Sequence, residues 1–190
     1  MATVIKICGL QDAGTARAAR SLGADYLGVV LTESRRRISV EAAAALIAEV
    51  PGAEFVAVGR DVPDALFQAM LRLPVAGVQL HGKTPADWIV RTRAAGKWAI
   101  ATQLDPNADV VLLDGTVPGS GQPREWTKPP YSRPIWLAGG LHPDNVQAVV
   151  RRLRPEGVDV SSGVEKDGQK RVELIARFIQ EVKHGDKEST

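Results

Sequence analysis

Cys8 and Asp114 are the two side chains whose type and position best suit proton-transfer chemistry. Cys8 follows the largely apolar residues 4–7, and Asp114 follows the apolar residues 110–113. A thiol has a pKa of ~8.5, so a modest downward shift makes it a usable base or nucleophile near neutral pH. A carboxyl group that is partly buried has a raised pKa and can serve as an acid. If the fold brings these two positions together, we expect an acid–base pair.

Each of these residues also fits an ordinary structural role. A single cysteine in an apolar run usually packs in the core, and aspartate before glycine usually makes a turn. His81, which follows another apolar run, is more often a structural hydrogen-bonding group than a catalyst. The positions of the other chain segments decide between these interpretations.

Glycine and serine follow two further apolar runs near the C-terminus. Gly139 and Gly140 come after residues 135–138, and Ser161, Ser162 and Gly163 come after residues 158–160. Loops of this kind after the last two strands of a barrel commonly bind phosphate through backbone N–H groups. Two glycines alone also suit any tight turn, but the two loops together favour a phosphorylated substrate.

The elements that must position these residues are eight short apolar runs rich in Val, Ile and Leu. They span residues 4–7, 26–31, 55–58, 75–80, 98–101, 110–113, 135–138 and 158–160. Continuous apolar runs are typical of strands buried on both faces, and helical spacing separates most of them. This α/β alternation predicts a single (β/α)₈ TIM barrel, for which roughly 190 residues just suffice. An open doubly wound sheet is the competing architecture.

Two connections depart from the regular pattern. Only residues 102–108 lie between the fifth run and Asp109, which directly precedes the sixth run, so we expect a helix-poor fifth crossover and no full helix there. Residues 115–133 carry four prolines and no clear periodicity, which is typical of a functional loop.

Several helix ends are marked by capping residues. A helix from Asp12 to Leu22 should close on Gly23, and Thr84-Pro85-Ala86-Asp87 resembles a capping box with proline at the first helical position. Gly96 should end that helix, Pro143 should begin another, and the last should span residues 172–182. We therefore expect one barrel domain over residues 1–183 and a frayed polar tail over residues 184–190.

Composition excludes several functional classes. The chain has 190 residues, of which 44% are hydrophobic and 24% are charged, and a net charge of +2 is too small to indicate nucleic-acid binding. Arg151, Arg152 and Arg154 lie late in a helical pattern, where cations complement the helix dipole.

No run approaches the ~18 apolar residues of a membrane span, and the N-terminus lacks a secretory pattern. A lone cysteine indicates a reducing cytoplasm.

Five motifs in a fixed order carry a resemblance to a known family. The sequence resembles the phosphoribosylanthranilate isomerases of tryptophan biosynthesis from Lys6 to about Phe178. The motifs are Lys6-Ile7-Cys8-Gly9-Leu10, Gln79-Leu80-His81-Gly82, Leu112-Leu113-Asp114, Leu137-Ala138-Gly139-Gly140-Leu141 with Asn145-Val146, and Val158-Asp159-Val160-Ser161-Ser162-Gly163-Val164-Glu165.

The resemblance implies a (β/α)₈ barrel that catalyses an Amadori rearrangement of N-(5-phosphoribosyl)anthranilate without metal or organic cofactor. Cys8 then matches the general base, Asp114 the general acid, and Arg36 the partner of the anthranilate carboxylate. Gly139, Gly140, Ser161, Ser162 and Gly163 match the phosphate-binding loops, and Asp159 a group that positions the substrate. The expected partner is the small phosphorylated substrate, with neither nucleic acid nor membrane, in a monomer or homodimer.

The sequence also departs from the family pattern. Residues 118–126 replace a Gly-Gly-Thr-Gly stretch, Gly59 stands where a phenylalanine is usual, and no acid follows the Gln-Leu-His-Gly motif. Lys170-Arg171 replaces Lys-Asp. These changes leave open a paralogue that acts on a related aminosugar phosphate. A second alternative, from a different class, is an inactive barrel that binds a phosphorylated metabolite or a partner protein. Retention of Cys8 and Asp114 counts against the inactive barrel, because binding needs neither.

Overall fold

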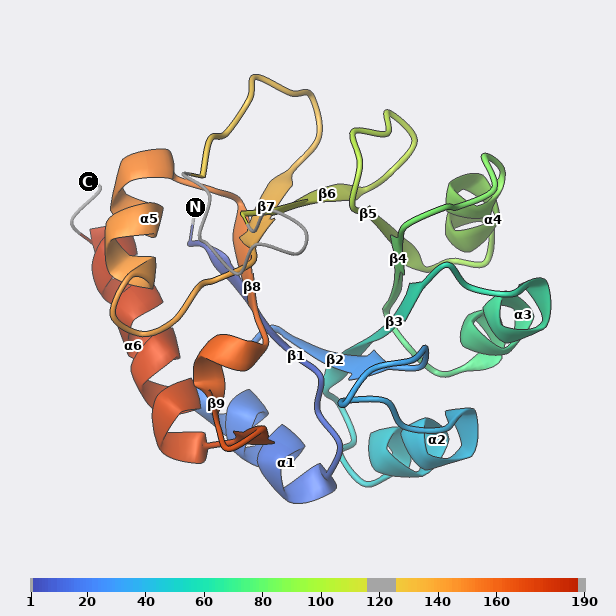
Figure 1. The fold of residues 1–190 in the computed structure, drawn as a ribbon, viewed down its shortest axis with the longest axis horizontal. Coiled ribbons are helices and arrows are strands. Elements are labelled where there is room, and N and C mark those ends of the chain that lie inside the picture. The colour runs from blue at the N-terminus through green and yellow to red at the C-terminus, as the bar shows by residue number, and fades with distance from the viewer. Residues whose placement is uncertain (1, 116–125, 188–190) are drawn as a thin grey trace.

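Eight parallel strands close into a barrel in the computed structural model, which describes residues 2–115 and 126–187 (Figure 1). Neighbouring strands pair in chain order, and β8 pairs back with β1, so the open doubly wound alternative is wrong. The strands are β1 (Val4–Cys8), β2 (Tyr26–Val30), β3 (Glu54–Arg60), β4 (Gly77–His81), β5 (Trp98–Ala101), β6 (Val110–Asp114), β7 (Ile135–Ala138) and β8 (Gly157–Val160).

The strands are buried on both faces, as their continuous apolar runs predict. One set of side chains packs outward against the helices and forms the larger core cluster. The opposite set fills the barrel interior and includes Cys8, Val56, Val58 and Leu112. Because side chains alternate along a strand, every second residue of β1 points inward, which places Lys6 and Cys8 in the same interior.

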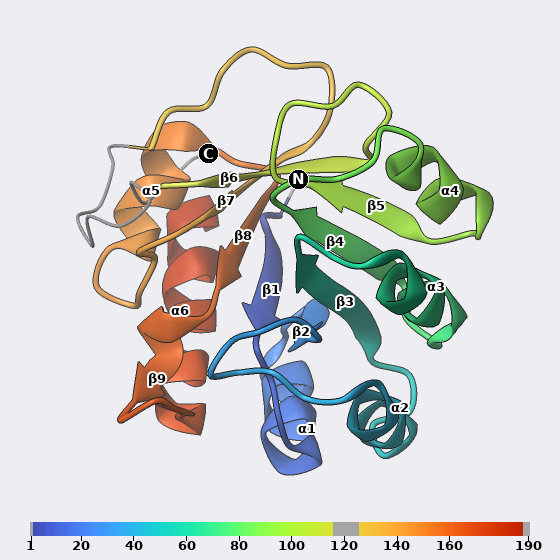
Figure 2. The same ribbon diagram turned by 45° about the vertical axis from the view of Figure 1, so that its right-hand side comes forward.

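The described residues form six α-helices around the barrel, and α1 to α4 follow one another around it in chain order (Figures 1 and 2). Asp12 caps the first helix by accepting a hydrogen bond from the backbone N–H of Thr15 at 2.8 Å, and Gly23 closes it with φ +107°, as predicted. The helices are α1 (Ala13–Leu22), α2 (Val40–Ala48), α3 (Asp64–Arg72), α4 (Trp88–Ala94), α5 (Val146–Leu153) and α6 (Val172–Lys187).

Two predicted helix starts are wrong by several residues. The α4 helix begins at Trp88 instead of Pro85, because the Trp88 N–H bonds the Pro85 carbonyl in a separate turn. The α5 helix begins at Val146 instead of Pro143. There the side chain of Asn145 accepts from the His142 N–H at 2.9 Å and donates to the Gly140 carbonyl, which holds the preceding residues in a loop.

The helix-poor fifth crossover is confirmed, since residues 102–109, all described, contain no helix between β5 and β6. Instead, Asp105 caps a turn by accepting from the Asn107 N–H at 2.8 Å.

Of the long segment before β7, residues 116–125 lie outside the described part. Trp126 anchors the described remainder by donating from Nε1 to the Ala138 carbonyl at 2.8 Å.

The segment after β8 contains a short 3₁₀ turn, η1 (Ser162–Val164), and a hairpin of β9 (Glu165–Lys166) and β10 (Gln169–Lys170). The α6 helix then continues to Lys187, so residues 184–187 of the predicted tail are helical. Gly185 packs tightly on α5, and the Asp186 carboxylate accepts from the backbone N–H and the hydroxyl of Thr3. Among the described residues, no helix is long and apolar enough to span a membrane.

Candidate active site

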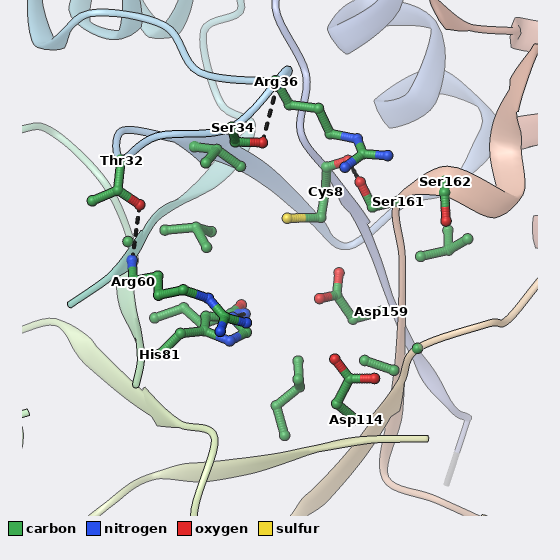
Figure 3. Close-up of a pocket in the computed structure, with 18 of the residues that line it drawn as sticks. Cys8, Thr32, Ser34, Arg36, Arg60, His81, Asp114, Asp159, Ser161 and Ser162 are labelled. Carbon is green, nitrogen blue, oxygen red and sulfur yellow. Dashed lines mark hydrogen bonds between the residues drawn. The ribbon is translucent and has the colours of Figure 1, made fainter. Parts of the chain in front are cut away.

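A cavity of about 370 Å³ opens at the C-terminal ends of the strands. The closed barrel brings together there almost every residue that the sequence analysis selected, from six different strand ends. Its lining includes Cys8, Arg36, His81, Asp114, Gly139, Gly140, Asp159, Ser161 and Ser162, and Figure 3 shows most of these side chains facing one space. Gly163 lies behind this lining, against the Leu141 carbonyl.

Cys8 is the most enclosed of the candidate catalytic groups, with 6% of its surface exposed. Gly28 on β2 makes room for the thiol, because a Cβ at that position would lie only 2.8 Å from Sγ. Burial raises the pKa of Cys8, and the nearby charge of Lys6 opposes that rise only in part. Burial therefore acts against the downward shift that would make this thiol a base near neutral pH.

Lys6 is a completely buried cation directly below Cys8 on the same strand. Its Nζ lies 2.9 Å from Oδ1 of Asp159, which is its register partner on β8. Burial alone would lower the pKa of Lys6, but Asp159 and Cys8 raise it, so the ammonium stays charged beneath the thiol. Sequence reasoning gave Lys6 no role; the available signal was a lysine two residues before Cys8 in an otherwise apolar strand.

Asp114 lies at the end of β6, and its carboxylate points toward Asp159 (Figure 3). A Cβ at Gly139 would lie 1.8 Å from Oδ1 of Asp114, so only glycine fits beside this carboxylate. Gly139 also has φ +75°, which favours glycine independently. Asp114 is exposed, in contrast to the partial burial we expected, and a bound substrate would have to cover it.

The side chain of Arg36 crosses over Gly9 to reach the cavity. A Cβ at Gly9 would lie 2.4 Å from Cδ of Arg36. Glu165 holds the guanidinium with two hydrogen bonds, from Nε at 2.6 Å and Nη2 at 2.8 Å. The same carboxylate accepts from Arg35 at 2.9 Å and from Lys170 at 2.6 Å. Burial would raise the pKa of Glu165, but the bonds from Arg36 and Lys170 lower it to about 2.

The loops after β7 and β8 are fixed by hydrogen bonds to neighbouring segments. Gly139 and Gly140 both have positive φ, and the Asn145 side chain holds the Gly140 carbonyl at 2.9 Å. Ser161 donates from Oγ to the Cys8 carbonyl at 3.0 Å, and Lys170 donates to the Ser161 carbonyl at 3.0 Å. The bond from Ser161 ties the loop after β8 to the strand that carries Cys8, and the Asn145 bond holds the loop after β7 within its own segment.

The opposite side of the cavity carries polar groups to which the sequence analysis gave no catalytic or binding role. Gln79 and His81 point inward from β4, with Nε2 of each 2.5 Å apart. Burial lowers the pKa of His81 to about 4, so the ring is neutral. Arg60 extends beside it from the end of β3 (Figure 3). At the neighbouring Gly59, a Cβ would lie 2.5 Å from Val62, whose side chain takes the space of a larger residue.

Comparisons with known proteins agree with this geometry. A family model described as N-(5'-phosphoribosyl)anthranilate (PRA) isomerase matches residues 5–181. The N-(5'-phosphoribosyl)anthranilate isomerase of Streptococcus pneumoniae serotype 19F (strain G54) is 40% identical over 196 residues, covering 96% of this chain and 97% of the relative.

Solved structures resemble the chain over nearly its whole length. A phosphoribosyl anthranilate isomerase from Thermus thermophilus has a TM-score of 0.80 and 32% identity, covering 95% of this chain and 98% of the relative. A phosphoribosyl anthranilate isomerase in complex with reduced 1-(o-carboxyphenylamino)-1-deoxyribulose 5-phosphate has a TM-score of 0.75 and 28% identity, with the same coverage.

Proposed function

Since the chain belongs to the N-(5'-phosphoribosyl)anthranilate isomerase family, we propose that it rearranges N-(5'-phosphoribosyl)anthranilate to 1-(2-carboxyphenylamino)-1-deoxyribulose 5-phosphate. The observation that carries the proposal is the convergence of Cys8 and Asp114 on one cavity bounded by the β7 and β8 loops. The reaction is a redox-neutral isomerisation within one molecule, so an acid and a base suffice.

Asp114 acts as the general acid in this proposal. It gives a proton to the furanose ring oxygen, the bond between that oxygen and C1 breaks, and the nitrogen lone pair forms an imine with C1. Its exposed position at the end of β6 leaves it accessible to a substrate that enters from the mouth of the barrel.

Cys8 acts as the general base in the next step. Its thiolate removes the proton from C2, which the adjacent imine makes acidic, and the electron pair moves to give an enolamine. C1 then gains a proton and the C2 hydroxyl loses one, which yields the ketone. The charged ammonium of Lys6 lies where it stabilises the thiolate form, and its bond to Asp159 holds that carboxylate beside the reacting carbons.

The two ends of the substrate are held by different loops. We assign the phosphate to the backbone around Gly139, Gly140, Ser161, Ser162 and Gly163, where loops of this type favour anions. We assign the ring carboxylate to Arg36, whose guanidinium suits a carboxylate and is held in place by Glu165.

The test is the fluorescence of the anthraniloyl substrate, followed after the wild-type protein is added, with the product identified by mass spectrometry and chromatography. We expect enzyme-dependent loss of the substrate signal and one product of unchanged mass. Turnover of another aminosugar phosphate, with none of the anthranilate compound, would overturn the substrate and favour the paralogue.

We further propose a cytoplasmic enzyme that acts as a monomer or homodimer. Cys8 must stay a free thiol to act as a base, and a reducing compartment keeps it so. Sedimentation of the wild-type protein at working concentration determines the oligomeric state.

A further inference from the structure

Arg60 places a guanidinium in the cavity that none of the roles proposed above uses. It is the last residue of β3, and strand alternation points its side chain inward like those of Val56 and Val58. Its backbone N–H donates to the hydroxyl of Thr32 at 2.9 Å, which fixes the strand end. In Figure 3 the side chain lies beside His81 and extends into the cavity.

The charge of Arg60 is not balanced by a neighbouring carboxylate. Its guanidinium makes no hydrogen bond or ion pair with any residue that the structure describes. His81 beside it is neutral, and Asp159 across the cavity is already paired with Lys6. A cation in a partly enclosed pocket without a protein counterion favours an anionic group of the ligand.

The position of β3 in the ring indicates which anionic group this is. In a closed barrel of eight strands in chain order, β3 lies opposite β7, whose loop we assigned to the phosphate. With the phosphate there and the ribose near Cys8 and Asp114, the aromatic ring extends toward β3. The phosphate and the ring carboxylate are then on opposite sides of the cavity.

We propose that Arg60 contacts the ring carboxylate of the substrate and is a specificity-determining residue of this enzyme. The inference rests on the proposed function. Arg36 already donates hydrogen bonds from Nε and Nη2 to Glu165, so only its remaining N–H groups are available to a ligand. A carboxylate has enough lone pairs to accept from both arginines, and Arg60 supplies the second guanidinium.

The experiment compares two substrates that differ only in this group: N-(5-phosphoribosyl)anthranilate and N-(5-phosphoribosyl)aniline, which lacks the carboxylate. For Arg60→Gln we expect kcat/KM to fall roughly 10- to 100-fold on the anthranilate compound, mainly through KM, as for loss of a hydrogen bond to a charged group. On the aniline compound the substitution should change little. Arg72→Gln on α3 removes the same charge outside the cavity and is the matched control.

The outcomes separate the alternatives. Equal losses of kcat/KM on both substrates would overturn the inference, because Arg60 would then act on the phosphate or on the fold. An unchanged kcat/KM on both substrates would also overturn it. Wild-type protein that turns over neither compound would overturn the proposed function first, and this inference with it. A calorimetric titration with reduced 1-(o-carboxyphenylamino)-1-deoxyribulose 5-phosphate should show the same weakening in Arg60→Gln, and unchanged affinity would contradict it.

Discussion

The thiol of Cys8 is subject to two opposing influences. Burial raises its pKa, and the buried ammonium of Lys6, held by Asp159, lowers it. A raised pKa makes the thiolate a stronger base but a rarer species at neutral pH. Lys6 therefore matters to catalysis through the fraction of Cys8 that is ionised.

We predict that Cys8 ionises above the usual thiol pKa of ~8.5 in the free protein. Cys8 is the only cysteine of the chain, so thiolate absorbance near 240 nm, taken as the difference from Cys8→Ser, reports it alone. Deprotonation should raise this absorbance with pH, with its midpoint above the usual value. Lys6→Met should move the midpoint further up, and a midpoint below that of a free thiol would contradict the account.

We also predict that Arg36→Ala acts on substrate binding more than on chemistry. Loss of a guanidinium partner of the carboxylate should raise KM roughly 10- to 100-fold and leave kcat comparatively unchanged, unless the bond forms only in the transition state. Steady-state kinetics measure both constants. Arg37→Ala, an exposed arginine in the same loop, is the control and should behave like wild type.

For single residues, the sequence predicted those whose role follows from their place at a strand end. Cys8, Asp114 and Arg36 all follow apolar runs, and they line one cavity. Lys6 and Glu165 gave no such signal, whereas Arg60 does end β3 but received no role from the sequence. The partner of Lys6 lies 153 residues away, and Glu165 meets Arg36 only because the β8 loop folds over the β2 loop.

Among the elements, the hairpin after β8 is joined to the loop after β2 by charge. Glu165 at the start of β9 binds Arg35 and Arg36 from one side and Lys170 of β10 from the other. The Glu165 side chain is 3% exposed, so its bonds to Arg36 and Lys170 are shielded from water, whereas the Arg35 side chain is 60% exposed. The pairing fixes Arg36 and also joins two segments that are far apart in the chain.

This pairing predicts a specific pH dependence of stability. The unfolded chain protonates Glu165 near its ordinary pKa of 4.5, and the folded protein only near 2. Between these values the unfolded state binds more protons, so the contribution of Glu165 to stability is present above pH 4.5 and is lost as pH falls toward 2.

Urea unfolding of wild type and Glu165→Gln across this range measures the effect. The difference in free energy of unfolding should be constant above about pH 5, within the range set by the carboxyl pKa values, and should shrink as the pH is lowered. A difference that does not change with pH would show that the carboxylate charge contributes nothing. Glu173→Gln, in the first turn of α6, is a control for loss of an acidic charge nearby.

The strands and the α1 caps could be predicted because their signals are local. Apolar runs and the pair Asp12 and Gly23 depend on neighbours in sequence. The starts of α4 and α5 could not, since Pro85 and Pro143 favour a helix start while side-chain and backbone bonds keep the loops open. The end of α6 was missed because Gly185 and Asp186 are fixed by α5 and Thr3, which are distant in the chain.

For the whole molecule, closure of the barrel is what makes the separate strand ends one site. β8 pairs with β1, which brings Asp159 to Lys6 and Ser161 to the Cys8 carbonyl. Glycines at 28 and 139 leave the space that the thiol and the Asp114 carboxylate occupy. The proposed acid and base therefore depend on the fold as a whole, and their removal should affect turnover far more than stability.

The most direct test compares turnover of N-(5-phosphoribosyl)anthranilate by wild type, Cys8→Ala and Asp114→Asn, with thermal unfolding measured on each. We predict that each substitution lowers kcat by roughly 10²–10⁴, as for a positioned acid or base. Cys8→Ser, which keeps the volume of the side chain, should lose as much activity as Cys8→Ala if the thiolate is the base. Wild-type rates in stably folded Cys8→Ala or Asp114→Asn would contradict the account.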